Sequence, residues 1–129
     1  MNHDRYEDAY LREILGSVRV IAMVGASPHW NRPSYFVMKY LQDKGFRLIP
    51  VNPKAAGETI LGEKVYGALR EIPDKIDMVD VFRNSAAAGP IVDDAIKIGA
   101  KVVWMQLGVR NDEAATLAED AGLKVVMNR

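Results

Sequence analysis

The segment between residues 18 and 37 constrains the fold more than any other part of the chain. It begins with a nearly continuous apolar run, Val18–Val24, which is typical of a strand covered on both faces. The turn formers Gly25–Pro28 follow, and Pro33 suits the first turn of a helix predicted over Pro33–Lys44. A strand, a glycine turn and a helix N-terminus in this order present backbone N–H groups and a positive helix dipole, a combination that suits an anion.

The same alternation of strand and helix continues to the end of the chain. Further strands are predicted at Phe46–Val51, Met78–Phe82, Lys101–Leu107 and Lys124–Met127, and further helices at Asp4–Leu15, Ala86–Ile98 and Glu113–Ala121. Weak strand character at Thr59–Leu61 and Lys64–Tyr66 precedes a short helical turn over Ala68–Ile72. Gly16 is expected to end the first helix, Ser85 to cap the third, and Asn111 or Asp112 to cap the last. This pattern predicts an α/β, Rossmann-like, doubly wound domain with a five-stranded, mainly parallel sheet and helices on both faces.

Composition limits the class of protein and its partners. The chain has 129 residues, of which 49% are hydrophobic and 26% charged, so we expect one globular domain over residues 1–129. Seventeen basic residues balance seventeen acidic ones, which argues against nucleic acid or a membrane surface as the partner. There is no cysteine, no apolar stretch long enough to span a membrane and no signal-peptide pattern, so a cytoplasmic location is predicted. Protein partners and oligomeric state stay open.

The ends of the first two strands carry the most informative polar residues, because ligands of such sheets bind beyond the carboxyl ends of the strands. Gly25-Ala26-Ser27 lets a phosphate approach the backbone, with the Ser27 hydroxyl as a donor and Arg32 as a second contact; a tight turn beside a solvated arginine is the alternative. The turn lacks the three glycines of the dinucleotide fingerprint. After the second strand stand Asn52, Pro53 and Lys54, where an NAD-binding domain has an acid.

A lysine at that position suits a ribose that carries an extra phosphate, either the 3′-phosphate of coenzyme A or the 2′-phosphate of NADP. A solvent-exposed loop lysine is the alternative for Lys54, and Asn52 could equally be a turn residue. Gln106, at the end of the fourth strand, could hydrogen-bond an amide such as those of pantetheine or tie two loops together. His3 is expected in a solvated tail and His29 in an exposed loop near the site. No catalytic triad and no metal-ligand cluster is spaced along the chain.

Four motifs in order resemble a known family: GAS at 25–27, VNP at 51–53, DVFR at 80–83 and WMQLG at 104–108. They are similar to the small stand-alone CoA-binding proteins and to the CoA-binding domain of the succinyl-CoA synthetase alpha subunit and of ADP-forming acyl-CoA synthetases. The resemblance runs from about Leu11 to Arg129. It implies that phosphates lie near Gly25, Ala26, Ser27, Arg32, Pro33 and Ser34, the adenosine end near Asn52, Pro53 and Lys54, the middle of the cofactor along Val81, Phe82 and Arg83, and the pantetheine arm toward Gln106, Leu107 and Gly108.

The resemblance implies a binding module for coenzyme A or an acyl-CoA, without a complete catalytic site of its own. The larger synthetases use a phosphohistidine on a separate domain, so their ligase chemistry is not carried over to this chain. Members of the small family usually continue past the position of Arg129 into a Cys-Pro and a short acidic tail, and no role of that cysteine is carried over either. Two alternatives stay open: an oxidoreductase or redox sensor that binds NADP or NAD, and a ligand-free regulatory interaction domain. A bulky side chain at Gly25 is expected to abolish binding and leave the fold intact.

Overall fold

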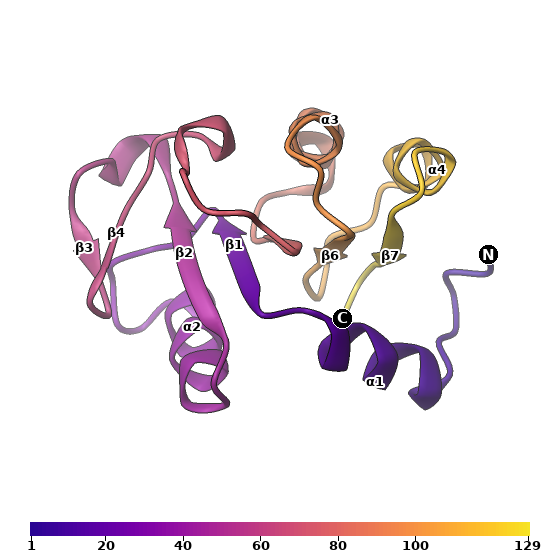
Figure 1. Cartoon of the computed structure of the whole chain (residues 1–129), viewed down its shortest axis with the longest axis horizontal. Coiled ribbons are helices and arrows are strands. Elements are labelled where there is room, and N and C mark those ends of the chain that lie inside the picture. The colour runs from indigo at the N-terminus through magenta and orange to yellow at the C-terminus, as the bar shows by residue number, and fades with distance from the viewer.

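Five parallel strands form the centre of the molecule in the computed structural model, which describes all residues 1–129 (Figure 1). The strands are β1 (Val20–Val24), β2 (Arg47–Val51), β5 (Met78–Val81), β6 (Val102–Met105) and β7 (Lys124–Val126). Their order across the sheet is β2-β1-β5-β6-β7, and every pairing is parallel. The chain therefore leaves β1 toward one edge and returns to the other side of it, which is the doubly wound arrangement with its switch point between β1 and β5. The predicted fold class is confirmed.

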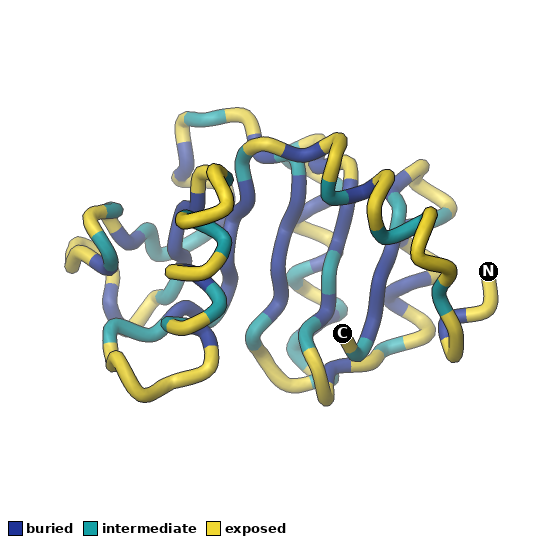
Figure 2. Tube along the Cα trace, turned by 90° about the horizontal axis from the view of Figure 1, so that it is seen from below, coloured by how far each residue is buried: buried dark blue, intermediate teal, exposed yellow.

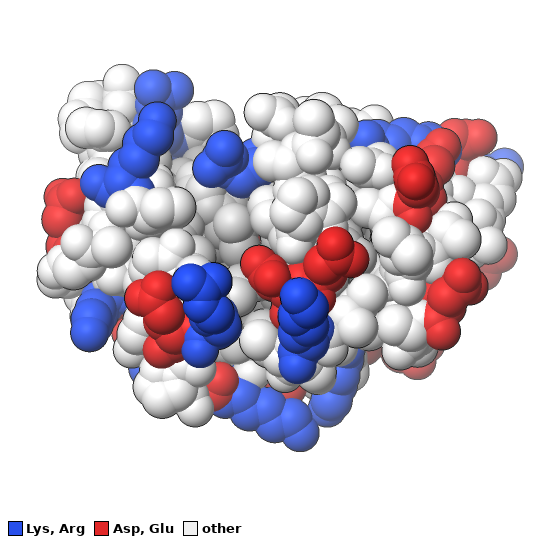
Figure 3. All heavy atoms as spheres, turned by 90° about the horizontal axis from the view of Figure 1, so that it is seen from above, with Lys and Arg blue, Asp and Glu red and all other residues white.

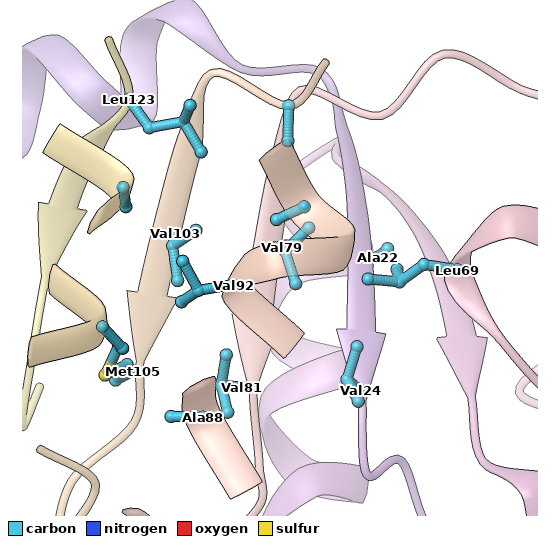
Figure 4. Packing of buried hydrophobic residues seen from close by; sticks show 14 of the residues in the cluster. Ala22, Val24, Leu69, Val79, Val81, Ala88, Val92, Val103, Met105 and Leu123 are labelled. Atoms are coloured by element: carbon cyan, nitrogen blue, oxygen red, sulfur yellow. The ribbon is translucent and has the colours of Figure 1, made fainter. Parts of the chain in front are cut away.

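Helices cover both faces of the sheet (Figure 1). On one face lie α1 (Asp8–Ser17) and α2 (Pro33–Asp43), and on the other lie α3 (Ala88–Lys97) and α4 (Asp112–Asp120). Helix α2 buries Met38 against the sheet, whereas Phe36 and Tyr40 of the same apolar run are exposed. On the α3 side, Val92 packs near Val79 and Val103 of the sheet (Figure 4). The strands are consequently the most deeply buried segments of the chain (Figure 2).

The connection from β2 to β5 contains little regular secondary structure. It contains one 3₁₀ turn at Pro53–Ala55, the antiparallel pair β3 (Thr59–Ile60) and β4 (Glu63–Lys64), and another 3₁₀ turn at Leu69–Glu71. The two weak strands and the helical turn expected here are present. The first strand and the turn are shorter than predicted by one and two residues, and the second strand, expected at Lys64–Tyr66, lies at Glu63–Lys64. This segment returns to the sheet edge at Tyr66, which bridges Val51 at the carboxyl end of β2.

The N-terminal segment differs from its prediction. Helix α1 begins at Asp8 rather than Asp4 and continues through Gly16. His3, expected in solvent, is 9% exposed, and its Nε2 lies 2.9 Å from Glu119 Oε1 while its Nδ1 lies 2.6 Å from the Tyr6 hydroxyl. The Met127 N–H donates to that same hydroxyl at 2.8 Å. These contacts with Glu119 of α4 and with Met127, which follows β7, hold the N-terminal segment outside the helix, because long-range hydrogen bonds outweigh the local helical spacing.

The predicted cap at Ser85 is also wrong. A 3₁₀ turn over Ser85–Ala87 precedes α3, and the cap belongs to Asn84, whose Oδ1 accepts from Ala87 N at 2.9 Å. The Ser85 hydroxyl instead accepts from Arg110 N at 3.0 Å. At α4, Asn111 is the cap and accepts from Ala114 N at 3.0 Å.

Acidic and basic side chains are interspersed over the face that carries α3 and α4 (Figure 3). The chain has seventeen acidic and seventeen basic residues. None of the helices has the length and hydrophobicity needed to cross a membrane.

Candidate functional site

The glycine turn after β1 is built around a backbone contact that only glycine permits. Gly25 has a φ of +91°, and a Cβ added to it would lie 2.4 Å from the backbone oxygen of Phe82. Real Cβ atoms do not approach oxygen this closely, and positive φ disfavours L side chains. The expectation that a bulky residue at Gly25 leaves the fold intact is therefore wrong, since such a residue must displace the end of β5 as well as obstruct the turn.

Asn52 braces this turn from the end of β2. Its Nδ2 donates to the carbonyl oxygen of Ala26 at 2.9 Å, and its Oδ1 accepts from Lys54 N at 3.0 Å. Both ends of the Asn52 amide are thus engaged within the protein. Of the two roles that the sequence left open, the structure shows Asn52 as the residue that ties the β2 turn to the glycine turn.

The N-terminus of α2 stands directly against the glycine turn. Ser34, 4% exposed, accepts the N–H of Ser27 on its hydroxyl at 3.0 Å, while the Ser27 hydroxyl accepts from His29 N at 3.1 Å. The backbone N–H groups of Ala26 and Ser34 have no partner in the protein, and the Ser27 hydroxyl proton is free to be donated. No acidic side chain occupies the first turn of α2. The turn therefore offers several donors and an uncompensated helix dipole to a negative group.

Three cavities follow the carboxyl ends of the strands and share lining residues. The glycine-turn cavity, about 370 Å³, is lined by Gly25, Ser27, His29, Arg32, Pro33, Ser34 and Phe82. The Gln106 cavity, about 590 Å³, is lined by Pro33, Val37, Phe82, Arg83, Asn84, Gln106, Leu107 and Val109. The Pro53 cavity, about 260 Å³, includes Val51, Pro53, Leu69, Arg83, Pro90 and Ile91 among its lining residues. Because Phe82 and Pro33 border the first two cavities and Arg83 borders the last two, an extended ligand could occupy all three.

Two arginines line these cavities, and the one carboxylate among the lining residues is Asp94 in the Pro53 cavity. Arg32 lines the glycine-turn cavity and Arg83 lines the other two, and neither forms a salt bridge with an acidic residue. No carboxylate lines the glycine-turn cavity or the Gln106 cavity. Lys54 is exposed and unpaired beside Pro53 but lines none of the three cavities. This arrangement suits a ligand with more than one anionic group.

The structure brings most of the sequence-predicted residues to the cavity walls. Gly25, Ser27, Arg32, Pro33, Ser34, Pro53, Phe82, Arg83, Gln106 and Leu107 line one cavity or another. The others do not: Ala26 and Val81 are buried, Asn52 is engaged in the turn, Lys54 is outside, and Gly108 donates its N–H to Asn128 Oδ1 at 2.7 Å. Val81 points into the apolar core toward α3 (Figure 4). Side chains of Val37 and Val109, which the sequence did not single out, line the Gln106 cavity.

Asp80 is the residue that sequence reasoning missed. It lies on the central strand β5, is 1% exposed, and accepts a hydrogen bond on Oδ1 from Gln106 Nε2 at 2.5 Å. Its other oxygen, Oδ2, is buried without a partner. Burial raises the pKa of Asp80 to about 7, although the Gln106 hydrogen bond acts in the opposite direction. The sequence did contain a signal for Asp80, which is an acidic residue inside the apolar run Met78–Phe82. Such a position indicates a special role, because carboxylates are rarely buried without a partner.

Comparisons with known proteins place the chain among its relatives. A family model described as a CoA binding domain matches residues 19–129. The Bacillus subtilis protein YneT, described as uncharacterized, is 38% identical over 120 residues, which cover 93% of this chain and 87% of that protein. A solved hypothetical protein from Pyrococcus horikoshii OT3 is 45% identical with a TM-score of 0.91, covering 100% of this chain and 89% of the other.

A larger relative is the alpha subunit of an ADP-forming acetate–CoA ligase I from Pyrococcus furiosus, 32% identical over 95 residues. That match covers 70% of this chain and only 21% of the ligase subunit. The similarity to the ligase is therefore a similarity to one part of it.

Proposed function

Because the chain belongs to the CoA-binding domain family, we propose that it binds coenzyme A or an acyl-CoA along the three connected cavities, as a binding module without a complete catalytic site of its own. The observation that carries the proposal is the glycine-turn cavity. There, the unpartnered N–H of Ser34 at the N-terminus of α2, the Ser27 hydroxyl and Arg32 lie at one space that no carboxylate lines. The pyrophosphate of coenzyme A is an anion of the kind that such a space stabilises.

The other two cavities suit the remaining parts of coenzyme A. The Gln106 cavity shares Pro33 and Phe82 with the glycine-turn cavity, and the Pro53 cavity shares Arg83 with the Gln106 cavity. The Pro53 cavity is lined largely by apolar side chains, which suits an adenine ring, and Lys54 stands outside it where a 3′-phosphate would emerge. The Gln106 cavity has both apolar walls and polar amide groups, as a pantetheine arm requires. Arg83 lies between the two and is available to a phosphate from either side.

A thermal-shift titration with CoA, acetyl-CoA, dephospho-CoA, NAD and NADP tests the proposal. A ligand that binds only the folded state adds about 2.7 kcal/mol at a concentration of about a hundred times its dissociation constant, which is several degrees in Tm for a domain of this size. We expect stabilisation by CoA and acetyl-CoA and a smaller effect of dephospho-CoA. A rise in Tm with NADP alone would favour the oxidoreductase alternative. No rise in Tm with any of these ligands would favour the ligand-free interaction domain.

The role of Lys54 is tested by the substitution Lys54→Ala. We expect weaker binding of CoA and unchanged binding of dephospho-CoA, because only CoA carries the 3′-phosphate. The exposed, unpaired side chain of Lys54 leaves the free energy of unfolding within about 0.5 kcal/mol of the original. Lys97→Ala, at the C-terminal end of α3, is the matched control for the loss of one positive charge. Equal losses for both ligands would remove Lys54 from the 3′-phosphate site.

A cytoplasmic location is part of the same proposal. Cell fractionation with an antibody to the chain tests it, and recovery in the membrane fraction would contradict it.

A further inference from the structure

A buried carboxyl and a cavity-lining amide form a pair at the floor of the Gln106 cavity. Asp80 is flanked in register by Met23 of β1 and Trp104 of β6, so its neighbours within the sheet offer it no charge. The Gln106 side chain supplies its one hydrogen bond, from Nε2 to Oδ1. Gln106 follows β6 and is half-buried, with Asp80 behind it and the cavity in front.

This pairing determines which end of the amide the cavity presents. An ionised carboxyl can only accept hydrogen bonds, so the NH₂ group of Gln106 must face Asp80 and the carbonyl oxygen must face away. Gln106 Oε1 has no partner within the protein, and it is absent from the buried unpartnered atoms, of which Asp80 Oδ2 is the sole case. The carbonyl oxygen is therefore accessible and unpaired in the cavity.

We propose that Asp80 is a positioning residue that holds Gln106 as a hydrogen-bond acceptor, so that the Gln106 cavity selects a ligand segment with an N–H donor, such as an amide of the pantetheine arm. The inference rests on the proposed function and adds the polarity of the contact and the residue that sets it. The other walls support the same ligand chemistry. Val37, Leu107 and Val109 give the cavity apolar walls that suit a hydrocarbon chain interrupted by an amide. Arg83 lines the cavity where it meets the Pro53 cavity.

The protonation state of Asp80 gives this arrangement a distinctive signature. Its pKa is raised to about 7 by burial, the Gln106 amide is the other group that acts on it, and no charged side chain from β1, β6, α1 or α2 contributes. A protonated carboxyl can donate to Gln106 Oε1, which lets the amide turn and point its NH₂ group into the cavity. An N–H of the ligand then loses its acceptor. Binding of the arm should therefore strengthen as the pH rises through about 7.

Isothermal titration calorimetry with two ligands at pH 6 and pH 8 isolates the contribution of the pantetheine arm to the binding affinity. The ligands are CoA and the β-methyl ester of 3′-phosphoadenosine 5′-diphosphate, which shares the nucleotide, the 3′-phosphate and the pyrophosphate diester of CoA but lacks pantetheine. We expect the preference for CoA over the short ligand to be roughly five- to tenfold greater at pH 8, the value of one hydrogen bond. Phosphate titration is common to both ligands and cancels in the ratio.

Variants at the two positions separate a positioning role from a structural one. Gln106→Met should remove most of the preference for CoA at pH 8 and leave the affinity for the short ligand unchanged. Asp80→Asn should make the preference independent of pH, because the new amide can pair with either end of Gln106. In the double variant Asp80→Asn/Gln106→Glu, the amide at position 80 donates to the carboxylate at position 106. The second oxygen of that carboxylate again accepts the ligand N–H, so the preference for CoA that Gln106→Met removes should be present.

The outcomes distinguish this inference from the proposed function. If neither ligand binds the original chain, the proposed function fails and the inference fails with it. If both bind, but the preference for CoA is the same at pH 6 and pH 8 or survives Gln106→Met, the proposed function stands and the positioning role of Asp80 is refuted. The pH profile of the unaltered chain keeps the inference open to refutation even if a variant does not fold.

Discussion

Replacing Asp80 by asparagine should stabilise the fold at neutral and alkaline pH. The carboxyl is 1% exposed, and one of its oxygens has no hydrogen-bond partner. Its pKa is raised from 3.8 to about 7 in the folded state. The unfolded chain therefore loses its proton at a lower pH than the folded chain, and the stability of the fold declines as the pH rises from about 4 to about 7.

The size of the effect follows from the same two pKa values. A difference of about three between the folded and unfolded pKa corresponds to about 4 kcal/mol of lost stability at pH 8. The loss is only about half a kcal/mol at pH 4, where the folded state is protonated and the unfolded state is roughly half ionised. Asparagine cannot ionise, so it avoids this loss and keeps an oxygen for Gln106 Nε2. Its NH₂ group takes the unpartnered position and costs roughly 1–3 kcal/mol. We therefore expect Asp80→Asn to be more stable than the original chain by roughly 1–3 kcal/mol at pH 8.

Urea unfolding of both proteins at pH 4.5, 6 and 8 measures this directly. The informative quantity is the change with pH in the stability difference between the two chains, because the cost of the unpartnered NH₂ group is common to every pH. That difference should shift in favour of the variant by roughly 3 kcal/mol between pH 4.5 and pH 8. Asp93→Asn, on the exposed surface of α3, is the matched control and should show a much smaller change. Parallel stability curves for Asp80→Asn and the original chain would refute the reasoning.

Two further substitutions test the glycine turn and a helix cap. Gly25→Ala should cost roughly 2–4 kcal/mol in the free energy of unfolding, because it adds a contact of 2.4 Å with Phe82 O to the strain of positive φ. Gly57→Ala has a similar φ of +88° and open space around its Cβ, so it measures the strain alone, and equal losses would contradict the clash. Asn111→Ala should cost about 1–2 kcal/mol by removing the cap on Ala114 N, whereas Thr116→Ala, exposed on the same helix, should cost less; thermal unfolding compares them, and no loss at Asn111 would contradict the cap.

Much of the architecture was predictable because it depends on local spacing. Each of the five strands is an apolar run that stops at turn formers, and the predicted bounds differ from the structure by at most two residues. Gly45, Gly99 and Gly122 all have positive φ at the points where the helices were expected to end. The glycine turn and the helix that starts at Pro33 were visible for the same reason. These features need only the residues next to them in the chain.

The candidate site, like the fold, could be predicted from the sequence only in part. Residues at strand ends were expected near the ligand because parallel strands bring their carboxyl ends to one edge, and most of them line the three cavities. The ligand contacts themselves remain predictions. Whether a polar residue faces the cavity or the protein was beyond the sequence: Asn52 turns to Ala26, and Ser85 to Arg110.

The sequence by itself determined the class of fold and the order of its elements, since hydrophobic period and turn residues act over a few positions. Only the tertiary structure decided the strand order, the burial of His3 against Glu119, and the pairing of Asp80 with Gln106. These last contacts join residues 116 and 26 positions apart. Such partners are chosen by how the packed elements meet, and no pattern within either segment specifies them.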